Sequence, residues 1–357
     1  MRKTIKLSKF WLLSIAIIGL SSAVNSQNKK RFKLLNSNKT GIDFVNKIKD
    51  TKEANILLYA NYYGGAGVGV GDFNGDNLQD IFFAGNLVED RLYFNQGDFS
   101  FKDVTEDSGV YNDGGWSTGV TVADINNDGH LDIYVSRELY DDKPDLRKNL
   151  LYINEGDGTF TEQAEDYGID DNQRTRHATF FDYDKDGWLD LLLLTQPPNP
   201  GSYSEFMGTT LLKPEYTLKL LRNTGKHFED VTKKAGLFLM GFPNGVSASD
   251  LNNDGWTDLY VTNDFYAPDR LLINNQDGTF SNKTNTAVNH MPYYSMGIDV
   301  ADINNDGLLD IFVVDMVAED NFRLKSNMSG MNPNSFWKVV NDGGHYQYMY
   351  NAMQLNN

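Results

Sequence analysis

Apolar and polar residues follow a repeated order along this chain, and each repetition is centred on a short acidic stretch. Before each stretch, apolar side chains stand two residues apart: Val68 and Val70, Val120 and Val122, Ala178 and Phe180, Val246 and Ala248, and Ile298 and Val300. After each stretch comes an uninterrupted apolar run, at residues 81–83, 133–135, 191–194, 259–261 and 311–313. Alternation is typical of a strand with one buried face, and a short continuous run is typical of a strand buried on both faces. Each acidic stretch is therefore predicted to connect two strands.

Two further strands are predicted in each repeat. A third apolar segment ends in asparagine at Asn95, Asn154, Asn223 and Asn274, and a tight turn follows it. A fourth segment then opens with Phe101, Phe160, Phe228 or Phe280. The acidic stretches recur at intervals of 52 to 68 residues. Four strands in each of about five such units predict an all-β fold, a β-propeller of four-stranded blades.

The acidic stretch is a nonapeptide that begins at Asp72, Asp124, Asp182, Asp250 and Asp302. Positions 1, 3, 5 and 9 are aspartate or asparagine, and position 6 is glycine in four copies and Asn77 in the first. A hard cation such as calcium takes about six to eight oxygen ligands, so the chain must curl tightly around it. A left-handed residue at position 6 would make that bend, and glycine fits it best. The pattern predicts a calcium loop in every repeat.

An EF-hand does not fit these loops. That motif has helical flanks and a bidentate glutamate at position 12. Here position 12 is apolar and falls inside the predicted second strands, as Phe83, Val135, Leu193, Val261 and Val313.

The chain has no cysteine, which excludes disulfides and thiolate metal sites. Its formal net charge is −17. Residues 1–26 carry four positive charges, so the remainder carries about −21, and five bound Ca²⁺ would reduce that to about −11. The acidity is therefore largely ligand charge. Nucleic acid and anionic membrane surfaces are not expected partners for so negative a protein.

The first 26 residues have the pattern of a secretory signal peptide. A basic head (Arg2, Lys3, Lys6 and Lys9) precedes an apolar run at residues 10–20, and small residues stand at 23–26. The run is short for a membrane span, and an uncleaved anchor is the alternative. We expect a secreted or cell-surface protein with no membrane insertion after cleavage. Its parts would be a signal at 1–26, a lead-in at 27–55 and blades at 56–357.

The repeats resemble the FG-GAP/VCBS family of calcium-looped propeller repeats, which also occurs in integrin α-chains. Residues 119–129 and 151–160 and their counterparts carry the resemblance. More closely, the chain is similar to bacterial proteins related to cartilage acidic protein, which often carry an ASPIC/UnbV segment. The resemblance runs from about residue 32 to residue 357, and it implies a propeller fold with bound calcium.

The resemblance also implies that the side chains at positions 1, 3, 5 and 9 of each loop bind the ion. These are Asp72, Asn74, Asp76 and Asp80; Asp124, Asn126, Asp128 and Asp132; Asp182, Asp184, Asp186 and Asp190; Asp250, Asn252, Asp254 and Asp258; and Asp302, Asn304, Asp306 and Asp310. The third loop has four carboxylates where the others have three. Because ligand charge helps to set calcium affinity, the third loop is predicted to bind most tightly.

Propellers of this family commonly have seven blades, whereas the fifth repeat here stops after its third strand, near Asn356. We expect a fragment of a seven-bladed ring, and a naturally shortened propeller is the alternative. The segment from Phe32 to Gly41 resembles that from Phe101 to Gly109. It could therefore supply the outer strand that closes the last blade of the ring.

A ligand is expected on the face opposite the calcium loops. In a four-stranded blade the calcium loop and the third-to-fourth-strand hairpin share one face, and the second-to-third connections lie on the other. Those connections are long in the third and fifth repeats, at residues 196–216 and 316–347. Long loops on a rigid scaffold often carry function. The alternative is that they only cover the ring or contact further blades.

Catalytic chemistry has little support. The histidines stand apart in the sequence, at 130, 177, 227, 290 and 345, and no nucleophile elbow or HExxH motif occurs. His130 and His177 occupy repeat positions that indicate structural roles, and Trp188 and Trp256 are expected to pack rather than to bind sugars. The chain is predicted to be a non-enzymatic binding or adhesion module for an extracellular protein or glycan, its oligomeric state unknown. The alternative is an accessory or catalytic propeller of a polysaccharide-degrading protein.

Overall fold

A computed structural model describes residues 32–197, 216–265, 267–326, 333–341 and 343–357. The signal predicted at 1–26 lies outside these residues, as does most of the insertion predicted at 196–216. Within the described ranges, no helix is both long and apolar enough to cross a membrane. The chain divides into two compact units, Met1–Thr40 and Gly41–Asn357.

Of the first unit, the structure describes an extended segment and the short helix α2 (Ser37–Thr40). Residues 32–36 have no strand conformation, and the ring-closing role predicted for this segment stays a prediction.

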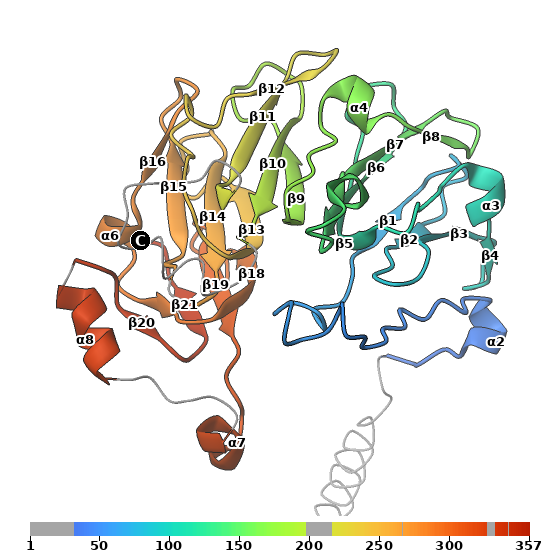
Figure 1. Ribbon diagram of the computed structural model, residues 1–357. Coiled ribbons are helices and arrows are strands. Elements are labelled where there is room, and N and C mark those ends of the chain that lie inside the picture. Colours follow the sequence, from blue (N-terminus) through green and yellow to red (C-terminus); the bar gives the residue numbers. More distant parts are fainter. Residues whose placement is uncertain (1–31, 198–215, 266, 327–332, 342) are drawn as a thin grey trace, which may run out of the picture. The chain divides into compact units, whose positions relative to one another are not determined.

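The second unit is a β-propeller whose described residues form five blades (Figure 1). The first blade is β1 (Val68–Gly71), β2 (Asp80–Phe83), β3 (Arg91–Asn95) and β4 (Phe101–Asp103); the second is β5 (Trp116–Ala123), β6 (Asp132–Glu138), β7 (Leu150–Asn154) and β8 (Phe160–Glu162). The third is β9 (Thr175–Phe181), β10 (Asp190–Thr195), β11 (Lys219–Asn223) and β12 (Phe228–Asp230); the fourth is β13 (Pro243–Ser249), β14 (Asp258–Asn263), β15 (Arg270–Asn274) and β16 (Phe280–Asn282). The fifth has three strands, β18 (Ser295–Ala301), β19 (Asp310–Asp315) and β21 (Ala352–Gln354). The predicted all-β fold is confirmed; the seven-bladed ring stays a prediction.

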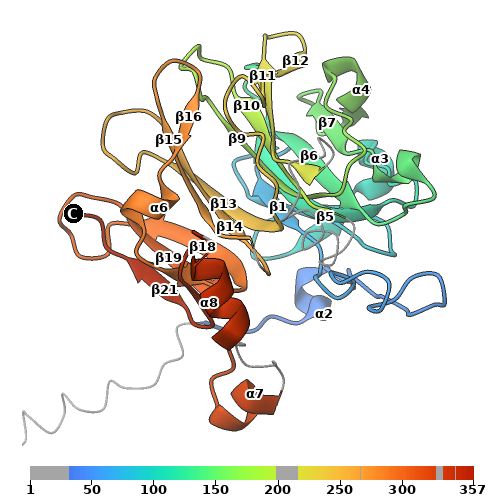
Figure 2. The same cartoon turned by 60° about the vertical axis from the view of Figure 1, so that its left-hand side comes forward.

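Every blade is an antiparallel meander, and its second strand is the most deeply buried. Every residue of β6, β10 and β14 is buried. The first strands of successive blades lie side by side, β5 against β9, β9 against β13 and β13 against β18 (Figures 1 and 2). Burial on both faces explains why the second strands have continuous apolar sequences.

The remaining elements are short. They are α3 (Thr105–Ser108), the 3₁₀ helix η1 (Pro144–Arg147), α4 (Ala164–Tyr167), α6 (Thr284–Ala287), and, around the insertion of the fifth blade, α7 (Asn321–Ser326), α8 (Pro333–Asn341) and β20 (Gln347–Tyr348), which pairs in parallel with β17 (Met291–Pro292). The insertion predicted at 316–347 thus has secondary structure of its own.

Aromatic and aliphatic side chains join each blade to the next. Phe73, at position 2 of the first loop, packs edge-on against Phe160 of the second blade, with ring centroids 6.0 Å apart. Tyr183, at position 2 of the third loop, instead stacks on Phe280 of the fourth blade, with ring centroids 6.4 Å apart. The corresponding Ile303 of the fifth loop is 47% exposed. Position 2 therefore contributes to the core between blades.

Two glycines allow the chain to pass close to a neighbouring strand. Gly109 ends α3 with φ +80°, and a Cβ on it would lie 2.5 Å from the carbonyl oxygen of Phe160. Gly41, with φ +75°, stands in the same relation to Phe101, also at 2.5 Å. The short-helix-then-glycine feature of the repeat is therefore present before the first blade, although the strand is not.

Candidate metal centres

Each acidic nonapeptide forms a loop with two left-handed residues. Position 6 has φ between +66° and +90° in the five loops, as predicted. Position 4 is left-handed as well, at Gly75, Asn127, Lys185, Asn253 and Asn305. The sequence pattern did not predict this second bend. Glycine and asparagine adopt it readily, whereas Lys185 does so at a cost in backbone energy.

The carboxylate at position 1 organises the loop. In all five copies its two oxygens accept the backbone N–H groups of positions 5 and 6, at 2.7–3.2 Å. The carboxylate at position 5 accepts the N–H of position 7 at 2.8–3.0 Å. These bonds curl the backbone around the side chains of positions 1, 3 and 5, which is the arrangement that an oxygen-bound cation needs.

The carboxylate at position 9 is buried beneath the loop and connects it to the sheet. Asp80, Asp132, Asp190, Asp258 and Asp310 are at most 1% exposed. One oxygen of each accepts the N–H of position 2, and the other accepts the N–H of the asparagine that ends or follows the third strand, at 2.7–3.0 Å. Burial raises the pKa of Asp132 to about 6 and that of Asp190 to about 7. A cation in the loop would favour the charged form of these groups.

That asparagine recurs in the sequence at the end of the third strand, and its role becomes clear only in the structure. The side-chain amides of Asn154, Asn223, Asn274 and Asn356 each donate to the carbonyl of position 8 in their own loop, at 3.1–3.2 Å. Each also donates to the carbonyl of position 2 in the loop of the preceding blade, at 2.7–3.1 Å. We call these four residues the loop clamps. They tie every candidate metal centre from the second to the fifth to the one before it.

The donor set fits calcium. The predicted ligands of each loop offer only carboxylate and amide oxygens, which hard cations prefer. In the third loop, carboxylate oxygens of Asp182, Asp184 and Asp190 lie within 4.8 Å of one another. Oδ1 of Asp184 is buried and accepts no hydrogen bond from any protein group. A buried carboxylate oxygen without a donor is costly unless a cation or water satisfies it.

The third loop differs from the others by an ion pair. In the four other loops, the amide at position 3 donates to the carboxylate at position 5, at 2.8–3.2 Å. Asp184 occupies position 3 of the third loop and cannot donate. Arg222 of β11 takes over this role, with Nε 2.7 Å from Asp184 and Nη2 2.7 Å from Asp186. Phe94, Ile153, Ile273 and Leu355 stand at the corresponding place in the other blades.

Side chains at position 7 pack rather than project. Trp188 covers Gly225 of the adjoining hairpin, where a Cβ would lie 2.9 Å from the indole, and His130 covers Gly156 at 2.7 Å. Trp256 has the ammonium of Lys185 over its ring, 4.5 Å from the centroid. The packing role predicted for Trp188 and the structural role predicted for His130 agree with these contacts.

Comparison with known proteins identifies relatives. A model of the family described as FG-GAP-like repeat matches residues 51–135, 142–193 and 250–313, which together exceed half of the chain. Among curated proteins, human cartilage acidic protein 1 is 29% identical over 146 residues. That match covers 37% of this chain and 21% of the human protein, so the chain spans about a fifth of the length of that relative.

Solved structures resemble the chain only distantly. An Agrocybe aegerita lectin that recognises non-reducing terminal N-acetylglucosamine is 18% identical with a TM-score of 0.38, and the match covers 69% of this chain and 60% of the lectin. The V. cholerae biofilm matrix protein Bap1 is 14% identical with a TM-score of 0.37, covering 70% and 35%. A GH43 β-1,3-galactosidase is 10% identical with a TM-score of 0.37, covering 71% and 86%.

Proposed function

Because the chain belongs to the FG-GAP-like repeat family, we propose that it is an extracellular propeller that binds calcium in its five acidic loops and serves as a binding module. The observation that carries the proposal is the shared geometry of the loops. Every copy has the same hydrogen bonds to the carboxylates at positions 1 and 5, and each anchors the carboxylate at position 9 beneath the loop. In the third copy, three carboxylates also lie within 4.8 Å of one another. The signal predicted at residues 1–26 supports the extracellular placement.

Calcium would have a structural role in this propeller. Three or four carboxylates crowd each loop, and their mutual repulsion opposes folding unless a cation offsets it. The ion supplies that positive charge when bound. The loop clamps then connect each neutralised loop to the next, through carbonyl oxygens such as that of Phe73. The loops would therefore stabilise the contacts between blades as well as the hairpins themselves.

The ligand of the module would be an extracellular protein or glycan, bound without chemical turnover. Since the loops are occupied with holding the scaffold, recognition would fall to other surfaces. Mixing the protein with a panel of glycans, and assaying both retention and product release, separates the alternatives. Release of shortened products would favour the polysaccharide-degrading alternative, and retention without products favours the module.

Calcium titration tests the metal centres. We expect isothermal titration of the chelator-stripped protein to show about five Ca²⁺ per chain, because structural loops of this type bind through several carboxylates. We also expect chelation to lower the melting temperature by roughly 10 °C or more, since ligand binding to the native state stabilises it. Asp98→Asn, an exposed hairpin substitution on the same face, is the matched control and should change neither result. A melting temperature that changes neither with chelator nor with added Ca²⁺ would refute a structural role for calcium.

A further inference from the structure

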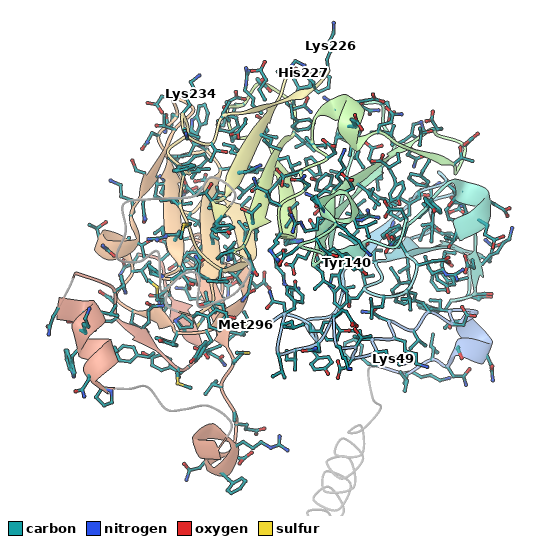
Figure 3. All side chains as sticks on the ribbon, in the orientation of Figure 1. Lys49, Tyr140, Lys226, His227, Lys234 and Met296 are labelled. Carbon is teal, nitrogen blue, oxygen red and sulfur yellow. The ribbon has the colours of Figure 1, made fainter. Side chains whose placement is uncertain are left out.

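A pocket with a volume of about 370 Å³ lies where the five blades converge. Its wall includes the sixth residue before each calcium loop, which lies at the start of the first strand in four blades and just before it in the first blade. These residues are Ala66, Thr118, Arg176, Asn244 and Met296. We call this the axial pocket. Met296 and, in the connection between β6 and β7, Tyr140 lie toward the end of the molecule away from Lys226 and His227, which belong to a hairpin on the calcium face (Figure 3).

β-Bulges orient the side chains that surround the axial pocket. The register shifts between Ser117 and Val120, between Pro243 and Gly245, and between Ser295 and Ile298. In the third blade the shift falls opposite Leu194 and Thr195, so that Arg176 is the unpaired residue. A bulge redirects the side chain of the extra residue. The same irregularity in four blades thus supplies the pocket wall.

The third blade departs from its sister blades at this place. Four blades have glycine at the fifth residue before the loop, at Gly67, Gly119, Gly245 and Gly297. The third has His177, next to Arg176, and both residues line the pocket. Since four blades fold with glycine there, the scaffold does not require the imidazole. Burial and the nearby Arg176 lower the pKa of His177, so the ring is neutral at pH 7 and can donate or accept a hydrogen bond.

Two carboxyl groups, in the blades on either side of the third, act electrostatically on Arg176 of the pocket. The sixth residue after position 9 is Asn86, Glu138, Gln196 and Asp264 in the first four blades. Asn86 and Gln196 join their blades to the next one, by donating to the carbonyls of Ser117 at 2.9 Å and Pro243 at 2.8 Å.

In the second and fourth blades, other side chains make these inter-blade bonds. Thr118 donates to the carbonyl of Thr175 at 2.8 Å, and Asn244 donates to that of Ser295 at 3.0 Å. Glu138 and Asp264 are therefore not needed for joining blades.

The charges of Glu138 and Asp264 both act on Arg176. Burial raises the pKa of Glu138 to about 7 and that of Asp264 to about 6; the positive charge of Arg176 lowers both, and that of Arg174 also lowers the pKa of Glu138. Glu138 is 1% exposed, and neither of its oxygens accepts a hydrogen bond. Arg176 itself donates to the carbonyl of Gly64 at 3.4 Å. Buried charged groups with unused hydrogen-bonding capacity beside a cavity are a mark of binding sites.

The chemistry of the pocket selects its ligand. An anion would gain from Arg176 but be repelled by Glu138 and Asp264, and a cation would meet the reverse. A neutral ligand with several hydroxyl groups can donate and accept hydrogen bonds at the same time. It is repelled neither by the carboxylates nor by the guanidinium. Val246, Met296 and Ile298 add apolar wall, against which the C–H face of such a ligand can pack. We propose that the axial pocket binds one neutral sugar unit of a glycan, with Arg176 and His177 as its specific contacts; this rests on the binding-module function proposed above.

Matched sugars test the proposal. D-Galactose, D-galactosamine and D-galacturonic acid share one framework and differ in charge, and D-glucose, D-mannose and N-acetylglucosamine extend the neutral set. Binding of each is followed by saturation-transfer NMR and calorimetry with calcium-loaded protein. At least one neutral sugar should bind, and galactose should not be outcompeted by its charged analogues. Failure of every neutral sugar to bind, or tighter binding of a charged one, overturns the proposal.

Two substitutions taken from sister blades locate the site. Arg176→Ala places the residue of the first blade at this position, and His177→Gly places that of the other four. Both should reduce sugar affinity at least tenfold, with the calcium-loaded melting temperature within about 2 °C of the parent. Trp256→Ala on the calcium face is the control and should bind normally. If sugar binds equally well to both pocket variants and to the parent, the axial site is wrong while the binding-module function stands. If the parent protein itself binds no ligand although its melting depends normally on calcium, both proposals are overturned.

Discussion

Arg222 forms an ion pair with Asp184, 2.7 Å from Nε to the carboxylate, and thereby joins the third strand of the third blade to its calcium loop. The third loop has one more carboxylate than any other, and its blade alone has an arginine at this place among the five repeats. Four carboxylates with one guanidinium carry the same net charge as three carboxylates. The extra ligand charge that led us to predict the tightest binding at this loop is therefore offset by a second residue in space.

Arg222→Ile should increase the calcium affinity of the third loop. Isoleucine stands at this place in the second and fourth blades, so the packing is known to be tolerated. Removing one partly exposed charge near the ligands should tighten binding by roughly two- to fivefold. Calorimetric titration checks this, with Ile153→Leu in the second blade as a control that changes no charge. Weaker binding in Arg222→Ile would mean that the guanidinium holds the ligands in place rather than offsetting their charge.

Asn154→Ala should destabilise the propeller through a lost loop clamp. Asn154 is 2% exposed, and its amide satisfies the carbonyls of Phe73 and Leu131. Two buried acceptors would lose their donors, at a cost of about 1–3 kcal/mol each. Asn95→Ala is the matched control, because the amide of Asn95 bonds the carbonyl of Gln79 in an exposed setting. Thermal unfolding in excess Ca²⁺ should show the larger drop for Asn154→Ala, and equal drops would contradict a clamp between blades.

Asp269→Asn should make the protein more stable than the parent at neutral and alkaline pH. Asp269 is fully buried, and burial raises its pKa to about 7. Because this value exceeds the unfolded value of about 3.9, its contribution to stability is complete below about pH 4 and is lost as the pH rises to about 7. Asn149 occupies the same place in the second blade, where it bonds the N–H of Arg137 and the hydroxyls of Tyr134 and Thr175. Asp269 bonds the N–H of Asn263 and the hydroxyls of Tyr260 and Ser295.

Melting temperatures from pH 4.5 to 8, each in excess Ca²⁺, check this difference between variant and parent. Asp269→Asn should melt higher than the parent at pH 8 and nearly equally at pH 4.5. Asn149→Asp is the reciprocal control and should introduce a new loss of stability on the alkaline side. Parallel curves for the three proteins would show that this carboxyl group does not titrate in the range.

Gly109→Ala should cost more stability than Gly168→Ala. Both glycines end a short helix with a positive φ, +80° and +71°, so both substitutions carry a similar backbone strain of about 1 kcal/mol. At Gly109, however, a Cβ would lie 2.5 Å from the carbonyl oxygen of Phe160, whereas at Gly168 the nearest atom is 3.7 Å away. The difference in melting temperature isolates the close approach of the chain to its neighbouring blade. A larger loss at Gly168 would contradict it.

The repeating parts of the fold could be predicted from the sequence because the same pattern of apolar and polar residues occurs in each of the five repeats. The fourth strands begin at Phe101, Phe160, Phe228 and Phe280, as the sequence indicates. Strand order and loop positions follow from the same pattern. The ring-closing strand predicted from residues 32–35 stays a prediction, because such a strand depends on a partner that local sequence does not reveal.

What sequence could not supply are relationships between blades. The ion pair of Arg222 joins residues 36 and 38 positions apart, and the bond of Asn154 to Phe73 joins residues 81 apart. An asparagine at the end of a strand indicates a turn. Its second hydrogen bond, to a carbonyl of the preceding blade, can be identified only in the folded structure. The same holds for the axial pocket, whose wall is assembled from five distant segments.

The loop clamps also bear on how such a protein changes in length over evolution. Each repeat contains both halves of its joint: a position-2 carbonyl that receives a clamp and an asparagine that provides one. Duplicating or deleting a whole repeat leaves every joint complete, whereas shifting the boundary by a few residues would separate donor from acceptor. The length of sequence that recombination can duplicate without breaking a contact between blades is therefore set by the two hydrogen bonds of a single asparagine amide.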